Sequence, residues 1–530
     1  MQKYSSPLIL FSTLILIGCS DDNNSSPSPS TFSIETSFQS CDTIVSQPEY
    51  DELTSQFNCG SLQLPLDWNN KGGKKIDYFV RQLPARETKR AQLWILPGGP
   101  GIAGDDYELA LWLAQRLPDT EIYMPDHRGT GRSDFLACTP EQSQQNFSND
   151  DFSDEDCLTY LTDNWNTNEL AQFNVTQAAE DIGQLINHFN PDGDEVYLYG
   201  SSYGTYWAQR YLHLYPSQAS GVFLDAVCSL TSCYEQNGYI ATYDTAGAEL
   251  LKLCDEDAFC SDKLGANAQE YLQNLYSLLE NGHCPVLDLS REDLQFITGA
   301  ALSERLLQAL LPAVMYRMTR CNEQDIEAIA YLFDAVGNRD DVGNESSDNE
   351  PEFVSLPESK GLTLNIRYSE LWDNNLTQAD ISAQAQTALF AGDGFGEGEV
   401  AEYDLQAQWP IYALDAFASM WPNTTTPMLI TNGMLDPITT IESAAELANQ
   451  YVQPNQQTII IPYAGHETLG DSPITDSDED CTGNLAIQFF QNPLQQLDSS
   501  CLDKQQAPDF EGDAESAMAA FNTVDYWENP

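Results

Sequence analysis

A short strand-like run leads directly into a glycine-flanked turn and then into a helix, and this junction constrains the fold more than any other feature. The run is Val196–Tyr199, the turn is Gly200-Ser201-Ser202-Tyr203-Gly204, and the helix-like segment is Tyr203–Leu214. The turn matches G-x-S-x-G, a pattern that lifts one serine above the edge of a sheet. Glycines flank it because side chains there would clash with the neighbouring strand and helix. We therefore expect an α/β fold with Ser202 as a nucleophile.

The same alternation of strand and helix continues on both sides of this turn. Strand-like runs are Gln92–Leu96, Glu121–Met124, Val222–Leu224, Pro427–Thr431 and Thr458–Ile461, and helix-like segments are Val175–Phe189, Ile441–Tyr451 and Asn484–Gln491. Alternation of this kind is typical of a parallel sheet covered by helices. Between about Cys228 and Trp409 helix-like segments dominate instead, such as Glu304–Arg320 and Gln324–Val336. One α/β domain interrupted by a helical insertion accounts for this order.

A nucleophilic serine needs a base, and the chain has five histidines, His127, His188, His213, His283 and His466. His466 follows the last predicted strand, in Ala464-Gly465-His466. That position fits the chain order serine, acid, histidine of α/β-hydrolases. We therefore predict that His466 is the base.

The acid that orients this base should lie between Ser202 and His466, where there are dozens of candidates. Asp436 follows the predicted strand Pro427–Thr431 and would reach the same sheet edge as His466. Asp225, at the end of the preceding strand, is the second candidate. For the oxyanion we expect the amide of Tyr203 and amides of Gly98 and Gly99, in the loop Gly98-Gly99-Pro100-Gly101 after an early strand.

Together with the segment Asp126-His127-Arg128-Gly129-Thr130-Gly131-Arg132-Ser133, these motifs resemble the proline iminopeptidase and tripeptidyl-aminopeptidase family of α/β-hydrolases. The Gly-Gly-Pro-Gly loop, the serine turn, the segment from Gly433 to Asp436 and Gly465-His466 all occur in family order. The resemblance implies an α/β-hydrolase fold with a largely helical cap inserted between two core segments. We expect core segments at 41–227 and 410–530, the latter with a C-terminal tail, and the cap at 228–409.

The resemblance also implies a serine exopeptidase whose partner is a peptide with a free N-terminus, cleaved through an acyl-enzyme. Family enzymes hold the substrate ammonium with carboxylates of the cap, and here the candidates are Glu323 and Glu370. A charged amine in a pocket needs a paired anion. Two alternatives stay open: an esterase that uses the same three residues on small esters or amides, and a non-catalytic binding module on the same fold.

The first residues predict export. A short positive start, Met1 to Lys3, precedes the apolar run Pro7–Ile17, which is too short to span a membrane. Leu16-Ile17-Gly18-Cys19 resembles a bacterial lipobox, in which the cysteine is lipidated. We expect a signal peptide at 1–18, a lipidated tether at 19–40, and an outer-membrane lipoprotein attached to the membrane only through its N-terminal lipid.

The cysteine count agrees with export. Without Cys19 the chain keeps twelve cysteines, an even number that suggests disulfides in an oxidising compartment. The order of the cysteines along the chain is compatible with disulfides between neighbours, and Cys481–Cys501 is the pair we favour. Spacing alone does not fix the connectivity. Neither CxxC nor HExxH occurs, so we expect no metal and no cofactor.

The charge excludes one class of partner. The chain has 81 acidic and 22 basic residues, a formal net charge of −59. A chain this acidic repels nucleic acids and anionic lipid surfaces, so we expect neither DNA nor RNA as a partner.

Overall fold

The sheet combines a parallel half with an antiparallel edge. The structure is a computed structural model that describes residues 37–41, 51–145, 152–231, 233, 240–341, 356–390 and 397–528. Its strand order is β1-β2-β3-β5-β4-β6-β7-β8-β9. The strands from β5 through β9 run parallel to their neighbours, whereas β1, β2 and β3 pair antiparallel and join the sheet at β5. The bounds are β1 Gln39–Ser40, β2 Asn58–Pro65, β3 Lys75–Leu83, β4 Ala91–Leu96, β5 Thr120–Pro125, β6 Glu195–Ser201, β7 Gly221–Asp225, β8 Met428–Gly433 and β9 Gln456–Ile461.

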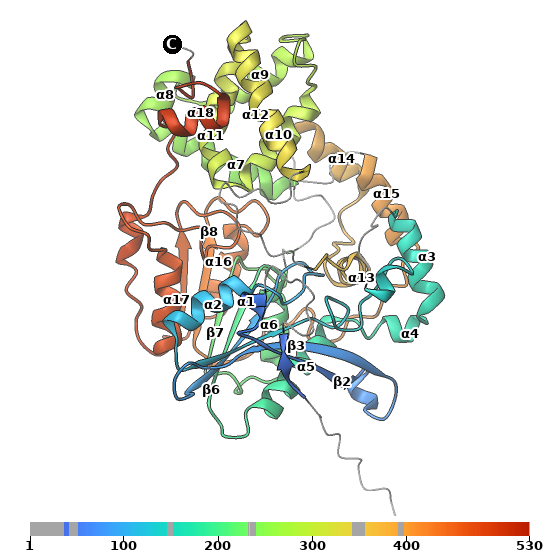
Figure 1. Cartoon of the computed structure of the whole chain (residues 1–530). Helices are drawn as coiled ribbons and strands as arrows, with labels where there is room; N and C mark the ends of the chain where they lie inside the picture. The colour runs from blue at the N-terminus through green and yellow to red at the C-terminus, as the bar shows by residue number, and fades with distance from the viewer. Residues whose placement is uncertain are drawn as a thin grey trace, which may run out of the picture. The chain divides into compact units, whose positions relative to one another are not determined.

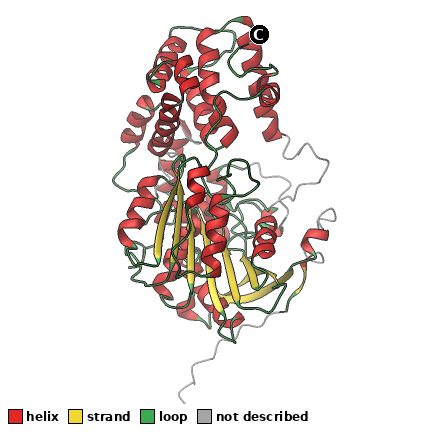
Figure 2. Cartoon of the chain, turned by 90° about the vertical axis from the view of Figure 1, so that its left-hand side faces the viewer, coloured by secondary structure: helices red, strands yellow, loops and turns green. Residues whose placement is uncertain are grey.

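The parallel strands are apolar because both faces of the sheet are covered. All six residues of β4 and of β8 are buried. On one face α2 (Tyr107–Arg116) and α17 (Cys481–Gln491) pack against the strands in a shared apolar core. On the other side α5 (Val175–Phe189) lies against α6 (Tyr203–Leu214), and α16 (Ile441–Gln450) contacts β8 and β9. Figure 2 shows helices on both sides of the strands.

The insertion between β7 and β8 is helical, as predicted. Helices α7–α12 share an apolar core of their own and lie together in Figure 1, while α13 contacts α3 beside the sheet. The bounds are α7 Ile240–Glu256, α8 Ala258–Leu264, α9 Ala268–Glu280, α10 Arg291–Leu302, α11 Arg305–Arg320, α12 Glu323–Asp341, α13 Lys360–Glu370, α14 Gln378–Thr387 and α15 Glu397–Gln406. The remaining helices are α1 Asp51–Thr54, α3 Asp154–Asn164, α4 Thr167–Leu170 and α18 Ala514–Phe521.

The end of the chain belongs to the cap and not to the second core segment. Phe510, Phe521 and Trp527 are buried in the apolar core of the cap helices. The buried guanidinium of Arg317 in α11 donates to the backbone carbonyls of Tyr526 and Asp525 at 2.6 and 2.8 Å. The sequence prediction counted these residues as the C-terminal tail of the segment 410–530, and the structure packs their apolar side chains on the cap helices. The sequence of α18 could not reveal where this helix packs, because a short amphipathic helix fits any apolar surface.

Six disulfides join cysteines that are neighbours along the chain, which confirms both the expected disulfides and Cys481–Cys501. The Cα–Cα distances of the six pairs lie between 4.1 and 5.6 Å, within reach of a disulfide. The pairs are Cys41–Cys59, Cys138–Cys157, Cys228–Cys233, Cys254–Cys260, Cys284–Cys321 and Cys481–Cys501. Such a set favours an oxidising compartment, as in exported proteins.

The N-terminal predictions fall on residues that are not described. The expected signal peptide 1–18 and Cys19 lie outside the described residues, as does the tether apart from residues 37–40. In the part of the chain that is described, no helix has the length and apolar character needed to cross a membrane.

Candidate active site

Ser202 occupies a sharp turn between β6 and α6. Its backbone has φ +51° and ψ −124°, a conformation that costs energy for any residue other than glycine. The turn is tight on both sides: a methyl group added at Gly200 would lie 2.5 Å from the carbonyl oxygen of Gly204. One added at Gly204 would lie 2.1 Å from the carbonyl oxygen of Leu96. Only glycine fits these two positions, so the sequence pattern G-x-S-x-G follows from the backbone geometry.

His466 and Asp436 meet at the ends of two neighbouring parallel strands. His466 lies in the loop after β9 and Asp436 in the loop after β8. The ring Nδ1 of His466 is 3.0 Å from Asp436 Oδ2 and 3.1 Å from Oδ1. Burial alone lowers the pKa of His466, but the adjacent Asp436 carboxylate, with smaller contributions from Glu467 and Asp225, raises it to about 9. The pairing fixes which nitrogen faces the acid and leaves Nε2 for another partner.

The carboxylate of Asp436 is buried and held by donors from its own turn. Oδ1 accepts hydrogen bonds from the amides of Ile438 and Thr439, both at 2.8 Å. Oδ2 accepts one from the Thr439 hydroxyl at 2.7 Å. The second candidate acid, Asp225, is occupied elsewhere: it accepts hydrogen bonds from the Thr431 hydroxyl and from the amides of Thr468 and Leu469. The geometry thus favours Asp436 over Asp225 as the partner of His466.

The segments that carry Ser202 and His466 meet through their neighbouring residues. A methyl group added at Gly98 would lie 3.1 Å from Ser202 Cβ and 3.6 Å from Glu467 Oε1, so three loops converge there. Ser201 and Glu467 also interact through their side chains. Among the described residues no hydrogen bond joins the Ser202 hydroxyl to the His466 ring. Catalytic hydrogen bonds commonly tighten only when substrate is bound.

His127, which follows β5, has a structural place instead. Its Nδ1 is 2.7 Å from the carbonyl of Arg128, and its Nε2 is 3.2 Å from the Tyr203 hydroxyl. Burial lowers the pKa of His127 to about 3, so the ring is neutral at physiological pH. The same motif holds two buried ion pairs, Arg81 with Asp126 and Arg128 with Asp181. Through these interactions the segment stabilises the core near the site.

The loop after β4 offers backbone amides beside the serine. Gly98 contacts the Ser202 side chain, as described above, and Gly99 has φ +103°. Within the described residues the amides of Gly98 and Gly99 donate to no protein acceptor. Tyr203, the third predicted donor, begins α6, where helix amides point outward toward an incoming anion. Pro97 supplies no amide, so Gly98 is the first donor of this loop.

The two glutamates expected to bind a substrate ammonium lie in different surroundings. Glu370 is buried and paired with Arg210 at 2.9 Å, and it accepts hydrogen bonds from the hydroxyls of Tyr412 and Tyr206. Its charge is therefore already neutralised inside the protein. Glu323 begins α12 and is exposed to solvent. The sequence could not reveal the Arg210 partner, which lies 160 residues away.

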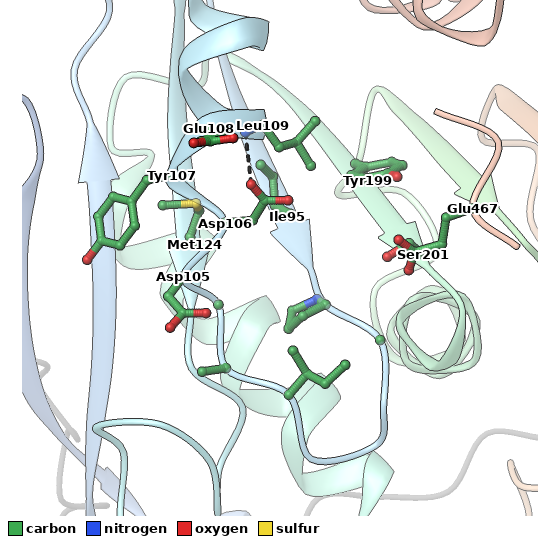
Figure 3. Close-up of a pocket in the computed structure, with 15 residues that line it drawn as sticks. Ile95, Asp105, Asp106, Tyr107, Glu108, Leu109, Met124, Tyr199, Ser201 and Glu467 are labelled. Carbon is green, nitrogen blue, oxygen red and sulfur yellow. Dashed lines mark hydrogen bonds between the residues drawn. The ribbon is translucent and has the colours of Figure 1, made fainter. Parts of the chain in front are cut away.

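An acidic cavity is lined by Ser201 and Glu467, the sequence neighbours of the predicted nucleophile and base (Figure 3). It has a volume of about 350 Å³ and is bounded by the loop after β4, the start of α2, Ser201 and Glu467. Its acidic side chains are Asp105, Asp106, Glu108 and Glu467, and none of the described lysines and arginines lines it. Burial raises the pKa of Asp105, Asp106 and Glu467. Sequence reasoning missed this cavity, although Glu467 directly follows His466.

The described residues contain no group of three or more histidine, cysteine or acidic side chains arranged to hold a metal ion. Several carboxylates near the site have protein donors instead. Asp105 accepts the amide of Leu356 at 2.9 Å, and Asp106 caps α2 through the amide of Leu109 at 2.9 Å.

Comparison with known proteins agrees with this architecture. The sequence profile of the alpha/beta hydrolase fold matches residues 93–293. Serine protease Hip1 of Mycobacterium tuberculosis strain H37Rv is 24% identical over 248 residues, which cover 42% of this chain and 46% of that protein. Hip1 of Mycobacterium bovis matches equally. The chain therefore spans about half the length of these relatives.

Solved structures with a similar course of the chain include three bacterial proteins. A putative lipase from Acinetobacter baumannii AYE is 15% identical, with a TM-score of 0.35, and the match covers 85% of this chain and 96% of that one. A carboxyl esterase from Bacillus coagulans is 12% identical, with a TM-score of 0.33, and covers 82% and 99%. A proline iminopeptidase-related protein from Thermus thermophilus is 16% identical, with a TM-score of 0.30, and covers 78% and 92%. From its sheet order and the profile match, the chain has the α/β-hydrolase fold with a helical cap.

Proposed function

We propose that the protein is a serine hydrolase in which Ser202 is the nucleophile, His466 the general base and Asp436 the orienting acid. The observation that carries this proposal is the pairing of His466 Nδ1 with the buried Asp436 carboxylate. The loop that carries His466 lies near the turn that holds Ser202 at φ +51°. A carboxylate in this place holds the imidazole in the required tautomer and stabilises the imidazolium.

The proposed reaction proceeds in two steps. Nε2 of His466 takes the proton of the Ser202 hydroxyl while Oγ attacks the substrate carbonyl carbon, and the carbonyl electron pair moves onto oxygen. The amides of Gly98, Gly99 and Tyr203 are the proposed donors to this oxyanion. His466 then returns its proton to the leaving group, and a water molecule releases the acyl group from Ser202 by the same proton transfers.

The finer proposal is an exopeptidase that cleaves amide bonds near the free N-terminus of a peptide. Two observations support an amine-bearing peptide as substrate. The cavity beside Ser201 is lined by four carboxylates and, among the described residues, by no lysine or arginine, which suits a cationic group. The relative with 24% identity is named a serine protease. In this proposal Glu467 and its neighbours take the role that the sequence had assigned to Glu323 and Glu370.

The activity can be tested with aminoacyl and tripeptidyl arylamides, each with a free and an N-acetylated terminus. Ser202→Ala should abolish turnover of all of them, and Ser217→Ala, at an exposed serine, should leave it unchanged. The free substrates should be preferred over the acetylated ones. Equal turnover of the two forms, or turnover of simple esters alone, would reject the exopeptidase and leave the esterase alternative. No turnover and no labelling of Ser202 by a fluorophosphonate would reject the hydrolase.

The proposed ammonium site has its own test. Glu467→Gln and Glu108→Gln should reduce the ratio of kcat/KM between the free and the acetylated substrate. The ratio matters because a change in the base itself would slow both substrates alike. Glu323→Gln, at an exposed site remote in sequence from the cavity, is the matched control and should leave the ratio unchanged.

We also propose that the protein is a lipoprotein of the cell envelope, anchored to the outer membrane through Cys19. The six disulfides support an exported protein, and the lipobox-like sequence before Cys19 supports lipidation. Metabolic labelling with a fatty-acid analogue should mark the wild type and not Cys19→Ser. Equal labelling of both would reject the anchor.

A further inference from the structure

The loop that carries His466 is held from two sides. Residues 462–472, here called the base loop, follow β9. On the core side the fully buried carboxylate of Asp225 accepts the amide and the hydroxyl of Thr468 at 3.0 and 2.6 Å and the amide of Leu469 at 2.9 Å. These bonds fix the part of the base loop that follows His466.

On the other side the base loop is held by one of its own carboxylates and by the cap. Asp471 Oδ2 accepts the amide of Gly465, the residue before His466, at 2.6 Å. Arg305, the first residue of cap helix α11, donates to the carbonyl of Tyr463 at 2.7 Å, and its guanidinium is 4.0 Å from Asp471 Oδ1. Arg305 also donates to the carbonyl of Gln506. One cap residue thus contacts the base loop on both sides of His466.

We propose that Asp471 and Arg305 are positioning residues that hold His466 in register with Ser202 and couple the base to the cap. The inference rests on the proposed function, in which His466 is the base. Removing the Asp471 carboxylate would leave the Gly465 amide without its acceptor and would leave Arg305 with Asp480 as its remaining counter-charge. The backbone next to His466 could then shift, and small displacements of a catalytic group are expensive in rate.

Several charged groups set the protonation of Asp471. Burial raises the pKa of Asp471 to about 6, although the Gly465 amide and Arg305 act in the opposite direction. Asp480, before α17, and Glu304, before α11, raise it further through like-charge repulsion. The ionised carboxylate is the form that attracts Arg305. Below about pH 6 Asp471 should become neutral, and the contact between cap and base loop should weaken.

The test compares Asp471→Asn, Asp471→Ala and Arg305→Ala with wild type on an arylamide substrate across the pH range. Asp471→Ala and Arg305→Ala should lower kcat by about 10-fold or more, with much smaller changes in KM, because they disturb the base and not substrate binding. Asp471→Asn keeps an oxygen for the Gly465 amide but cannot ionise. It should retain more activity than Asp471→Ala and should lose the part of the acidic decline that titrates near pH 6.

Hydrogen–deuterium exchange gives a readout that does not depend on turnover. Exchange of the peptide covering residues 462–472 should increase in Asp471→Ala and Arg305→Ala. Asp257→Asn is the matched control, because Asp257 also accepts a backbone amide, that of Cys260 at 2.7 Å, but caps helix α8 in the cap. It should change neither the exchange of the base loop nor the pH profile.

The outcomes separate this inference from the proposed function. If wild type is active and all three variants keep its kcat, pH profile and base-loop exchange, the positioning role is wrong while the hydrolase stands. An equal fall of activity in Asp257→Asn would also overturn it, because the effect would then reflect general stability. If wild type neither turns over substrate nor reacts at Ser202, both proposals fail together.

Discussion

His466 Nδ1 lies 3.0 Å from Asp436 Oδ2, and that same oxygen accepts the Thr439 hydroxyl at 2.7 Å. The amides of Ile438 and Thr439 occupy the other oxygen. Hydrogen bonds within its own turn therefore fix the orientation of the Asp436 carboxylate toward the imidazole of His466. Because Asp436 is fixed in this way, we can predict the direction in which it shifts the pKa of His466 and the pH range in which activity responds.

The pH dependence of activity should follow the raised pKa of His466. The base must be neutral to accept the serine proton, so kcat/KM should still rise between neutral pH and about pH 9. In Asp436→Asn the attraction that raises this pKa is lost, and the acidic limb should move to lower pH. The plateau of kcat should fall by about 10⁴-fold, since the amide favours the wrong tautomer. Steady-state kinetics with a substrate of constant charge measure both effects. An acidic limb at the same pH in wild type and variant would contradict the role of Asp436.

Replacing Ser202 by glycine should separate stability from activity. Glycine adopts φ +51° without strain, so Ser202→Gly should be inactive yet more stable than wild type by about 1 kcal/mol. Ser202→Ala, which keeps a Cβ, should be inactive without this gain. Denaturant unfolding of the three proteins measures the difference. If the glycine variant were no more stable than the alanine variant, the turn would not be strained.

Glu370 should matter for stability and not for substrate binding. Its pairing with Arg210 is buried, so Glu370→Gln should leave the Arg210 guanidinium with only the partly exposed Asp415, at 3.8 Å, as counter-charge and should lower the free energy of unfolding by about 3 kcal/mol. Glu323→Gln, at an exposed position, should change it by less than about 0.5 kcal/mol. Urea denaturation gives both values. A stable Glu370→Gln protein with an increased KM only for substrates with a free N-terminus would restore its predicted binding role.

The disulfides should differ in how much each contributes to the free energy of unfolding. Cys284 and Cys321 are 37 residues apart, whereas Cys228 and Cys233 are 5 apart. From the loop-closure entropy of the unfolded chain, replacing both cysteines by serine should cost about 4 kcal/mol for the first pair and about 2 kcal/mol for the second. Denaturant unfolding of the two double variants tests this order. The reverse order would show that native-state contacts outweigh loop closure.

Much of the parallel sheet could be predicted from the sequence, because its strands contain short, mostly apolar runs. The helices Val175–Phe189 and Tyr203–Leu214 also have the bounds that their periodicity predicts. The antiparallel strands β2 and β3 were missed. Over part of their length exposed and buried residues alternate, which is a weaker signal than an unbroken apolar run.

By itself the sequence determined the local structures that depend on near neighbours: the glycines around Ser202, the helix that follows, and the order of serine, acid and histidine. Only the tertiary structure decided which carboxylates face which partners. It placed Asp436 beside His466 and paired Arg210 with Glu370. It also placed the Asp471 carboxylate at the amide of Gly465 and packed the last helix on the cap. The reason is physical: a turn or a helix is fixed by a few adjacent residues, whereas the partner of a charge is fixed by the path of the whole chain between them.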